Sequence, residues 1–149
     1  MAVNRAELID CLNELIQICR DGESGFQTAA DRVKDPELRE LFEKRSVQRA
    51  QFAHELASEV RLLGGTPLKS GSAPAAFHRG WINIKSKVRD VNDDAIIAEC
   101  ARGEDAALET YQRVLKLNLP PNVLPVAKHQ FTELKRSHDY IRGLGQKAA

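Results

Sequence analysis

The sequence predicts an all-α fold, a bundle of four long helices in two hairpins joined by one long connection. Four segments repeat apolar residues at spacings of three and four, which is typical of helices with one buried face. The first two segments, and the last two, are separated by only a few residues, so each pair should form an antiparallel hairpin. The middle connection greatly exceeds the ~2–8 residues usual between bundled helices, so it should cross to the other end of the bundle.

The first hairpin is bounded by clear start and stop signals. Its first helix should run from about Asn4 to Val33, with Asn4 as the N-cap. Asp35-Pro36 starts the second helix, because Asp caps well and Pro suits the first helical position, and Gly64-Gly65 ends it. Gly22 and Gly25 interrupt the first helix, and we interpret them as sites of close helix packing or a small kink. Room for a ligand is the alternative.

The second hairpin should begin at Asp93 and turn at Leu119-Pro120-Pro121. Its first helix is predicted from Asp93 to about Leu117, and its second from about Asn122 to Arg142, ending at Gly143. The tail from Gly145 to Ala149 should fray. Within the connection, residues 77–91 predict a shorter helix with a sparse apolar side, made of Phe77, Trp81, Ile84 and Val88.

Length and composition limit the possible functions. A chain of 149 residues is most simply one domain, residues 1–149. Its 22 Lys and Arg nearly cancel 21 Asp and Glu, which gives no reason to expect nucleic acid or a membrane surface as a partner. There is no apolar run of membrane-spanning length and no signal-peptide pattern at the start. Three cysteines without a metal-ligand spacing suggest free thiols and a cytoplasmic location.

Three polar residues interrupt the apolar faces at mid-bundle. Glu104 lies inside the stripe of the third helix, Arg49 in the polar middle of the second helix's stripe between Arg45 and Phe52, and His138 on the apolar face of the fourth. Folding the hairpins at their turns places Glu104 near Lys135 and His138, and Arg49 roughly level with Arg20, Asp21 and Gly22. Because buried carboxylates are rare unless paired, we expect Glu104, Arg49 and His138 to form a buried polar network.

The connection carries a second candidate site. His78, Arg79 and Trp81 lie within four residues and could bind an anion or a partner. The structural interpretation, which we favour, is that Trp81 pins the predicted short helix onto the bundle.

Two long hairpins joined by a long crossover resemble the ferritin-like four-helix bundle. The third-helix stretch around Glu104, from Cys100 to Tyr111, and SHDYIRGL at residues 137–144 are similar to rubrerythrin-type proteins. The combination of GSAPAAFHRGW, ECARGED and His138-Asp139 more closely resembles a small bacterial family of ferritin-like bundles without an established activity. The resemblance covers nearly the whole chain.

The resemblance raises the question of a di-metal centre. Di-iron bundles take a Glu from each of two helices and a Glu-x-x-His from each of the other two. Residues three before the four histidines are Gln51, Ala75, Val126 and Lys135, so no Glu-x-x-His exists. Only Glu104 and His138 match the expected ligands by position, and the cation Arg49 would repel a metal. We therefore predict that the di-metal site is lost.

Two functions follow as hypotheses. The first is a non-enzymatic, stress-related or binding and structural module without a cofactor, self-associating as a homo-oligomer and most simply a dimer. The second is a divergent metal-dependent oxidoreductase or metal-binding protein of the rubrerythrin or ferritin type, using iron or manganese. The second rests on analogy of fold alone. A single metal bound by Glu104 and His138 remains open, with Glu55 or Asp21 as possible further ligands.

Overall fold

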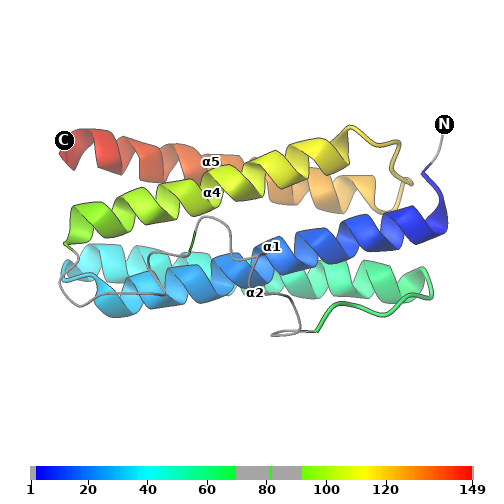
Figure 1. Ribbon diagram of the computed structural model, residues 1–149, viewed down its shortest axis with the longest axis horizontal. Helices are drawn as coiled ribbons and strands as arrows, with labels where there is room; N and C mark the ends of the chain where they lie inside the picture. The colour runs from blue at the N-terminus through cyan, green and yellow to red at the C-terminus, as the bar shows by residue number, and fades with distance from the viewer. Residues whose placement is uncertain (1–2, 70–80, 82–91, 149) are drawn as a thin grey trace.

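Four helices build the computed structural model, which describes residues 3–69, 81 and 92–148 (Figure 1). They are α1 (Arg5–Arg32), α2 (Pro36–Leu62), α4 (Asp93–Leu115) and α5 (Leu124–Ala148). The described part of the chain contains no strand. The predicted caps are in place, because the Asn4 side chain accepts from the Glu7 N–H and the Asp35 side chain from the Glu37 N–H. The predicted all-α bundle is therefore confirmed.

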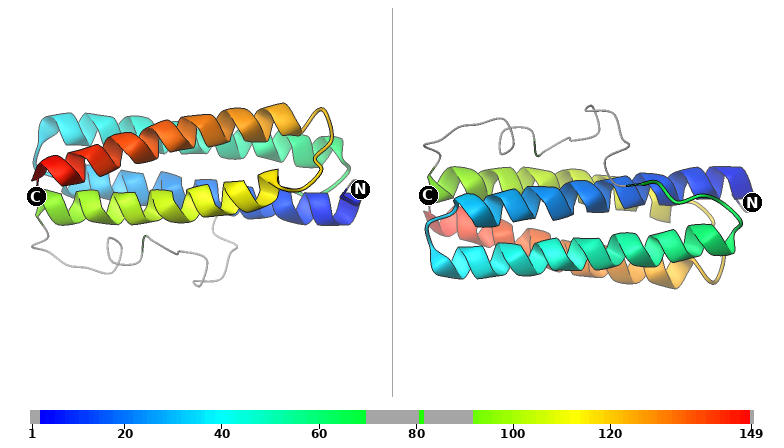
Figure 2. Two further views of the ribbon diagram at one scale, coloured as in Figure 1. Left: turned by 90° about the horizontal axis from the view of Figure 1, so that it is seen from above. Right: turned by 90° about the horizontal axis from the view of Figure 1, so that it is seen from below.

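The helices form two antiparallel hairpins stacked on one another (Figures 1 and 2). Helix α1 contacts α2 and α4, and α5 contacts α4 and α2, so α1 lies diagonally opposite α5 and α2 opposite α4. Each helix buries one stripe of its surface toward the common axis. Side chains from any two helices can therefore meet at the centre of the bundle.

The ends of the crossover are fixed at opposite ends of the bundle. At one end, α2 ends at Leu62 and is followed by Gly64, whose φ of 81° suits glycine, and Arg5 Nε donates to the Leu63 carbonyl oxygen at 2.5 Å. At the other end, the Asp93 carboxylate accepts from the backbone N–H groups of Lys34 and Asp35 at 2.9 and 3.0 Å. Gly64 and Asp93 thus lie at opposite ends of the bundle, as a long crossover requires.

The core consists of two apolar clusters with a polar level between them. One cluster surrounds Leu12, Leu56, Tyr111 and Leu134, and the other surrounds Phe26, Phe42, Ile96 and Ile141. The residues between them along the four helices include Gly22, Arg49, Glu104 and Ser137, all of which are buried. The helices therefore bring polar groups together at mid-length.

The fourth helix is longer than predicted. The prediction that the fourth helix ends at Gly143 is wrong, because α5 continues to Ala148. Leu144 packs against the cluster around Phe26 and Ile141, and this contact keeps the helix going past a glycine that disfavours it only weakly. The helix predicted within residues 77–91 lies outside the described residues, apart from Trp81.

Candidate functional site: a buried arginine–glutamate pair

Arg49 and Glu104 form an ion pair across the diagonal of the bundle. Arg49 Nη1 lies 2.5 Å from Glu104 Oε1, and Arg49 Nη2 lies 2.9 Å from Oε2, so both carboxylate oxygens accept from one guanidinium. The exposed fraction of the side chain is 2% for Arg49 and 0% for Glu104. A two-point contact of this kind fixes both the distance and the orientation of the two groups.

Residues of α1 shape the space that Arg49 occupies. A Cβ atom at Gly22 would lie 3.2 Å from Cγ of Arg49, so the missing side chain leaves room for the arginine stem. The guanidinium Cζ lies 5.2 Å from the centroid of the Phe26 ring, within range of a cation–π contact. Gly22 and Phe26 are four residues apart and share one face of α1. The glycine thus serves packing, in this case of a charged side chain.

Arg49 keeps its charge although it is buried. Burial alone would lower the pKa of Arg49, but attraction and hydrogen bonding to Glu104 outweigh it, so the pKa of Arg49 is raised. The pKa of Arg45, one turn earlier on α2, is lowered mainly by burial and to a smaller extent by repulsion from Arg49. Removing Glu104 would leave the Arg49 charge in the core without its partner.

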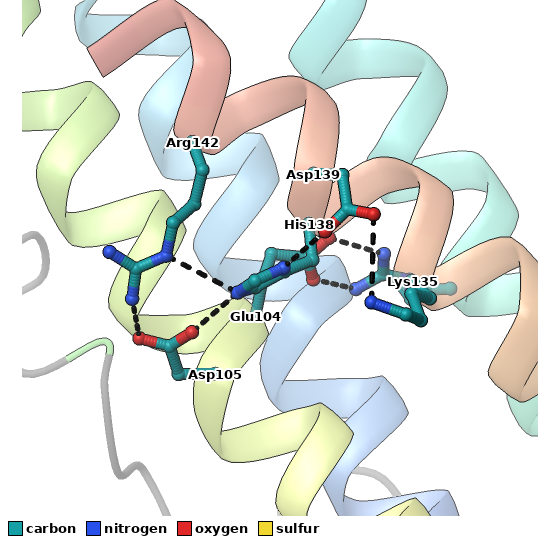
Figure 3. A network of polar contacts seen from close by, with 7 residues as sticks. Glu104, Asp105, Lys135, His138, Asp139 and Arg142 are labelled. Atoms are coloured by element: carbon teal, nitrogen blue, oxygen red, sulfur yellow. Dashed lines mark hydrogen bonds and ion pairs between the residues drawn. The ribbon is translucent and has the colours of Figure 1, made fainter. Parts of the chain in front are cut away.

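His138 belongs to a separate network at the edge of α4 and α5 (Figure 3). Its Nε2 lies 2.6 Å from Asp105 Oδ1, and its Nδ1 lies 3.0 Å from Asp139 Oδ1. Arg142 also contacts Asp105, and Lys135 lies 3.6 Å from Asp139. An imidazole with a carboxylate at each nitrogen has neither nitrogen free for a substrate or a metal. Glu104 is thus held by Arg49, while Lys135 is exposed and pairs elsewhere.

A further network, buried except for the exposed Glu55 at its end, lies near the ion pair and was not predicted. Cys19 Sγ lies 3.2 Å from the Tyr111 hydroxyl, which donates to Gln130 Oε1 at 2.6 Å. Gln130 Nε2 donates to Glu55 Oε1 at 2.9 Å and to the Phe52 carbonyl oxygen at 3.2 Å. Burial raises the pKa of Cys19 to about 11. These contacts join all four helices at a position along the bundle that is close to Arg49 and Glu104.

The missed network has a simple cause. In the sequence, the polarity of Gln130 and Ser137 gives no sign that they are buried, whereas the spacing of the fourth helix places His138 on its apolar face. In the structure Gln130 and Ser137 are buried, at 0% and 1% exposure, whereas Phe131 and His138 are only partly buried. The sequence does contain a signal for this inner face, because five residues recur at spacings of three and four: Ala127, Gln130, Leu134, Ser137 and Ile141.

The second candidate site is described only in part. His78 and Arg79 lie outside the described residues. The Trp81 side chain is 2% exposed and packs with the core cluster around Phe26, Ile96 and Ile141. Trp81 is thus part of the packed interior.

The described residues do not fit the di-iron group that the fold suggests. Both oxygens of Glu104 are engaged by Arg49, a fixed positive charge at the centre of the bundle. Within residues 3–69, 81 and 92–148, no group of three or more His, Cys, Asp and Glu residues could hold a metal ion. Asp21 and Glu55, considered as further ligands, therefore complete no such group with Glu104 and His138. We assign no chemical step to a metal.

Solved structures support the fold at low sequence identity. A dodecameric thioferritin from Bacteroides fragilis has a TM-score of 0.79 and 16% identity, over 98% of this chain and 89% of that one. A bacterioferritin from Desulfovibrio desulfuricans with a diiron site has a TM-score of 0.78 and 18% identity, over 97% and 84%. In a two-domain protein from Anabaena variabilis with a ferritin-like domain, TM-score 0.78 and 14% identity, the match covers 99% of this chain but 38% of that one.

Sequence comparisons identify the family. No curated protein matches the chain. None of the helices in the described segments is long and apolar enough to cross a membrane. The family described as a domain of unknown function (DUF2383) matches residues 7–117, well over half of the chain. The protein therefore belongs to the DUF2383 family and has a ferritin-like four-helix-bundle fold.

Proposed function

We propose that this protein works without a metal centre, as a self-associating binding or structural module of the cytoplasm, in a stress-related or similar role. The observation that carries the proposal is the two-point contact between Arg49 and Glu104. A guanidinium supplies the positive charge that a central carboxylate needs. Unlike a metal ion, it is covalently attached to the chain and always charged. A cation entering the bundle would have to displace it from both oxygens. The pair thus takes the place of a metal as the central cross-link between helices.

The test is elemental analysis combined with a stability measurement. The protein is purified from cells supplied with iron and manganese, as wild type, as Glu104→Ala and as Glu40→Ala. Glu40 is an exposed glutamate of α2, with a side-chain exposure of 69%, and serves as the matched control. We expect less than stoichiometric metal in all three proteins, and a large loss of thermal stability in Glu104→Ala only.

The opposite result would favour the second function, a metal-dependent oxidoreductase or metal-binding protein using iron or manganese. One or two metal ions per chain in the wild type and in Glu40→Ala, lost in Glu104→Ala, would refute the proposal. The support for this alternative is the diiron site of the D. desulfuricans bacterioferritin, a structural neighbour, together with the central position of Glu104. Oxidase and peroxidase assays would then be the next step.

Self-association is the second part of the proposal, and a dimer is its simplest form. The thioferritin neighbour is a dodecamer, which supports an oligomer in general. On this chain, a groove between α1 and α2 carries Val47, which is 59% exposed, beside Arg20, Glu23 and Glu55. A two-fold contact places one surface against its own copy, so a patch that holds both charges and an exposed apolar residue can be complementary to itself.

A further inference from the structure

The Trp81 side chain lies in a slot between α1 and α4 that two glycines open. A Cβ atom built on Gly25 would lie 2.2 Å from Cδ2 and Cε3 of the indole. A Cβ atom built on Gly103 would lie 2.2 Å from Cε2 and 2.6 Å from Nε1. Real side chains essentially never approach so closely, so any residue with a Cβ at either position collides with the ring. Both glycines are therefore matched to the indole.

The third side of the slot is aromatic. The Phe26 and Trp81 rings are 5.0 Å apart between centroids, with an angle of 66° between their planes. This edge-to-face arrangement is a favourable one for two aromatic rings. Helix backbone at Gly25 and Gly103 bounds the ring on the α1 and α4 sides. The slot is thus shaped for a flat, two-ring aromatic group.

Contacts that do not involve Trp81 hold α1 and α4 in place. The Asp93 carboxylate ties the start of α4 to the turn between α1 and α2. Cys19 of α1 contacts Tyr111 of α4, and Arg49 ties α2 to Glu104 of α4. Glycine walls also have no side chain that could rotate into an empty slot. The slot should therefore persist when the indole is absent, as rigid apolar cavities do.

We propose that the space between Gly25 and Gly103 is a binding site for a flat bicyclic aromatic group, and that this chain fills the site with its own Trp81. The site is independent of the function proposed above, because it uses neither the charge of Glu104 nor self-association. In the wild type, the attached ring competes at an effective concentration of about millimolar or higher, so a free ligand of the same class is excluded.

The first experiment uses tryptophan fluorescence, since Trp81 is the only tryptophan of the chain. The wild type, Gly25→Ala, Gly103→Ala and Gly143→Ala are compared by emission wavelength and by quenching with acrylamide. Gly143 is the matched control, because it also lies in a helix but has no atom within 4 Å of an added Cβ. We expect red-shifted emission and stronger quenching in Gly25→Ala and Gly103→Ala, and wild-type values in Gly143→Ala.

The second experiment offers the site a free ligand. Indole is titrated into Trp81→Ala, the wild type and the double variant Trp81→Ala with Gly103→Ala, and the melting temperature and the heat of binding are measured. We expect one indole per chain and a rising melting temperature in Trp81→Ala only. Cyclohexanol, which is not flat, should have no such effect at the same concentrations.

The outcomes decide the proposal in either case. A folded Trp81→Ala that does not bind indole overturns it, because the slot would then not exist without the side chain. Wild-type emission in both Gly25→Ala and Gly103→Ala also overturns it. If Trp81→Ala fails to fold, the fluorescence comparison decides alone: displaced indole in both glycine variants, with Gly143→Ala unchanged, supports a site matched to the ring.

Discussion

At the scale of single residues, the Arg49–Glu104 pair determines the character of the bundle centre. The Arg49 guanidinium lies 5.2 Å from the centroid of the Phe26 ring, and both side chains of the pair have almost no contact with solvent. The cost of removing such charges from water is large, and a good pair roughly offsets it. The pair is therefore expected to define the arrangement of the helices more than it raises their overall stability.

A comparison of single and double variants tests this expectation. Glu104→Gln keeps the shape of the side chain but leaves the Arg49 charge uncompensated, so we expect a loss of about 3–5 kcal/mol in the free energy of unfolding. Arg49→Met combined with Glu104→Leu removes both charges and should lose much less than Glu104→Gln. Urea unfolding measures both changes. A double variant as unstable as the single one would show that the pair itself, and not the avoided charge, stabilises the fold.

Cys19 predicts a change of stability at alkaline pH. Burial raises the pKa of its thiol from 9.0 to about 11 in the folded state. Above pH 9 the unfolded chain releases this proton while the folded protein retains it, so stability is complete below pH 9 and falls as the pH rises toward 11. The loss should be on the order of 2–3 kcal/mol, from ~1.4 kcal/mol per pKa unit.

Cys19→Ser isolates this contribution, because serine keeps a hydroxyl toward Tyr111 and does not titrate in this range. We expect a smaller decline between pH 9 and 11 in Cys19→Ser than in the wild type, measured by urea unfolding at each pH. Burial also raises the pKa of Tyr111 and Cys100, so part of the decline should remain. Equal declines in the two proteins would rule out Cys19 as a source.

At the scale of helices, Asp93 connects one end of the crossover to the first hairpin. Its carboxylate accepts from two successive backbone N–H groups at the turn between α1 and α2. Asp93→Ala leaves these groups without their partner, at a cost of about 1–3 kcal/mol. Asp94→Ala removes another first-turn acid of α4 from an exposed position and is the control. Thermal unfolding should distinguish the two, and equal effects would mean that only the helix dipole is involved.

The sequence predicts the helices well because their boundaries are set locally. Asn4, Asp35 and Asn92 cap three helices as their residue types suggest. Apolar periodicity likewise places Arg49 and Glu104 at mid-bundle. The end of α5 was not predictable in this way, because it depends on the contact of Leu144 with another part of the chain.

Polar residues in the interior limit prediction more than helix ends do. Gln130 is fully buried because Tyr111, Glu55 and the Phe52 carbonyl satisfy its amide, and all three lie on other helices. From sequence alone its polarity indicates the surface. His138 shows the opposite case. Its apolar neighbours in the sequence indicate the interior, but in the structure it is only partly buried and pairs with Asp105. Such assignments require the packed partner, which no local pattern supplies.

At the scale of the whole molecule, the ferritin-like bundle here has a central polar level built from its own side chains. Arg49 and Glu104 link one diagonal, and the Cys19–Tyr111–Gln130–Glu55 contacts connect all four helices beside it. Similar architectures with a diiron site, such as the D. desulfuricans bacterioferritin, share at most 18% identity with this chain among the neighbours described above. The likeness is therefore one of fold, and the outer surfaces are where a binding role would be expressed.

Val47 offers the most direct test of self-association. It is 59% exposed and lines the α1–α2 groove near Arg20 and Glu23, so a two-fold partner would cover it. Val47→Lys places two like charges against each other in such a dimer, and we expect the mass measured by light scattering to fall toward that of one 16.6 kDa chain. Leu62→Lys is the control, because Leu62 is 76% exposed at the end of α2 and lies outside the groove. An unchanged oligomer in Val47→Lys would exclude the groove as the interface. A shift in Leu62→Lys alone would move the interface to the Gly64 end of the bundle.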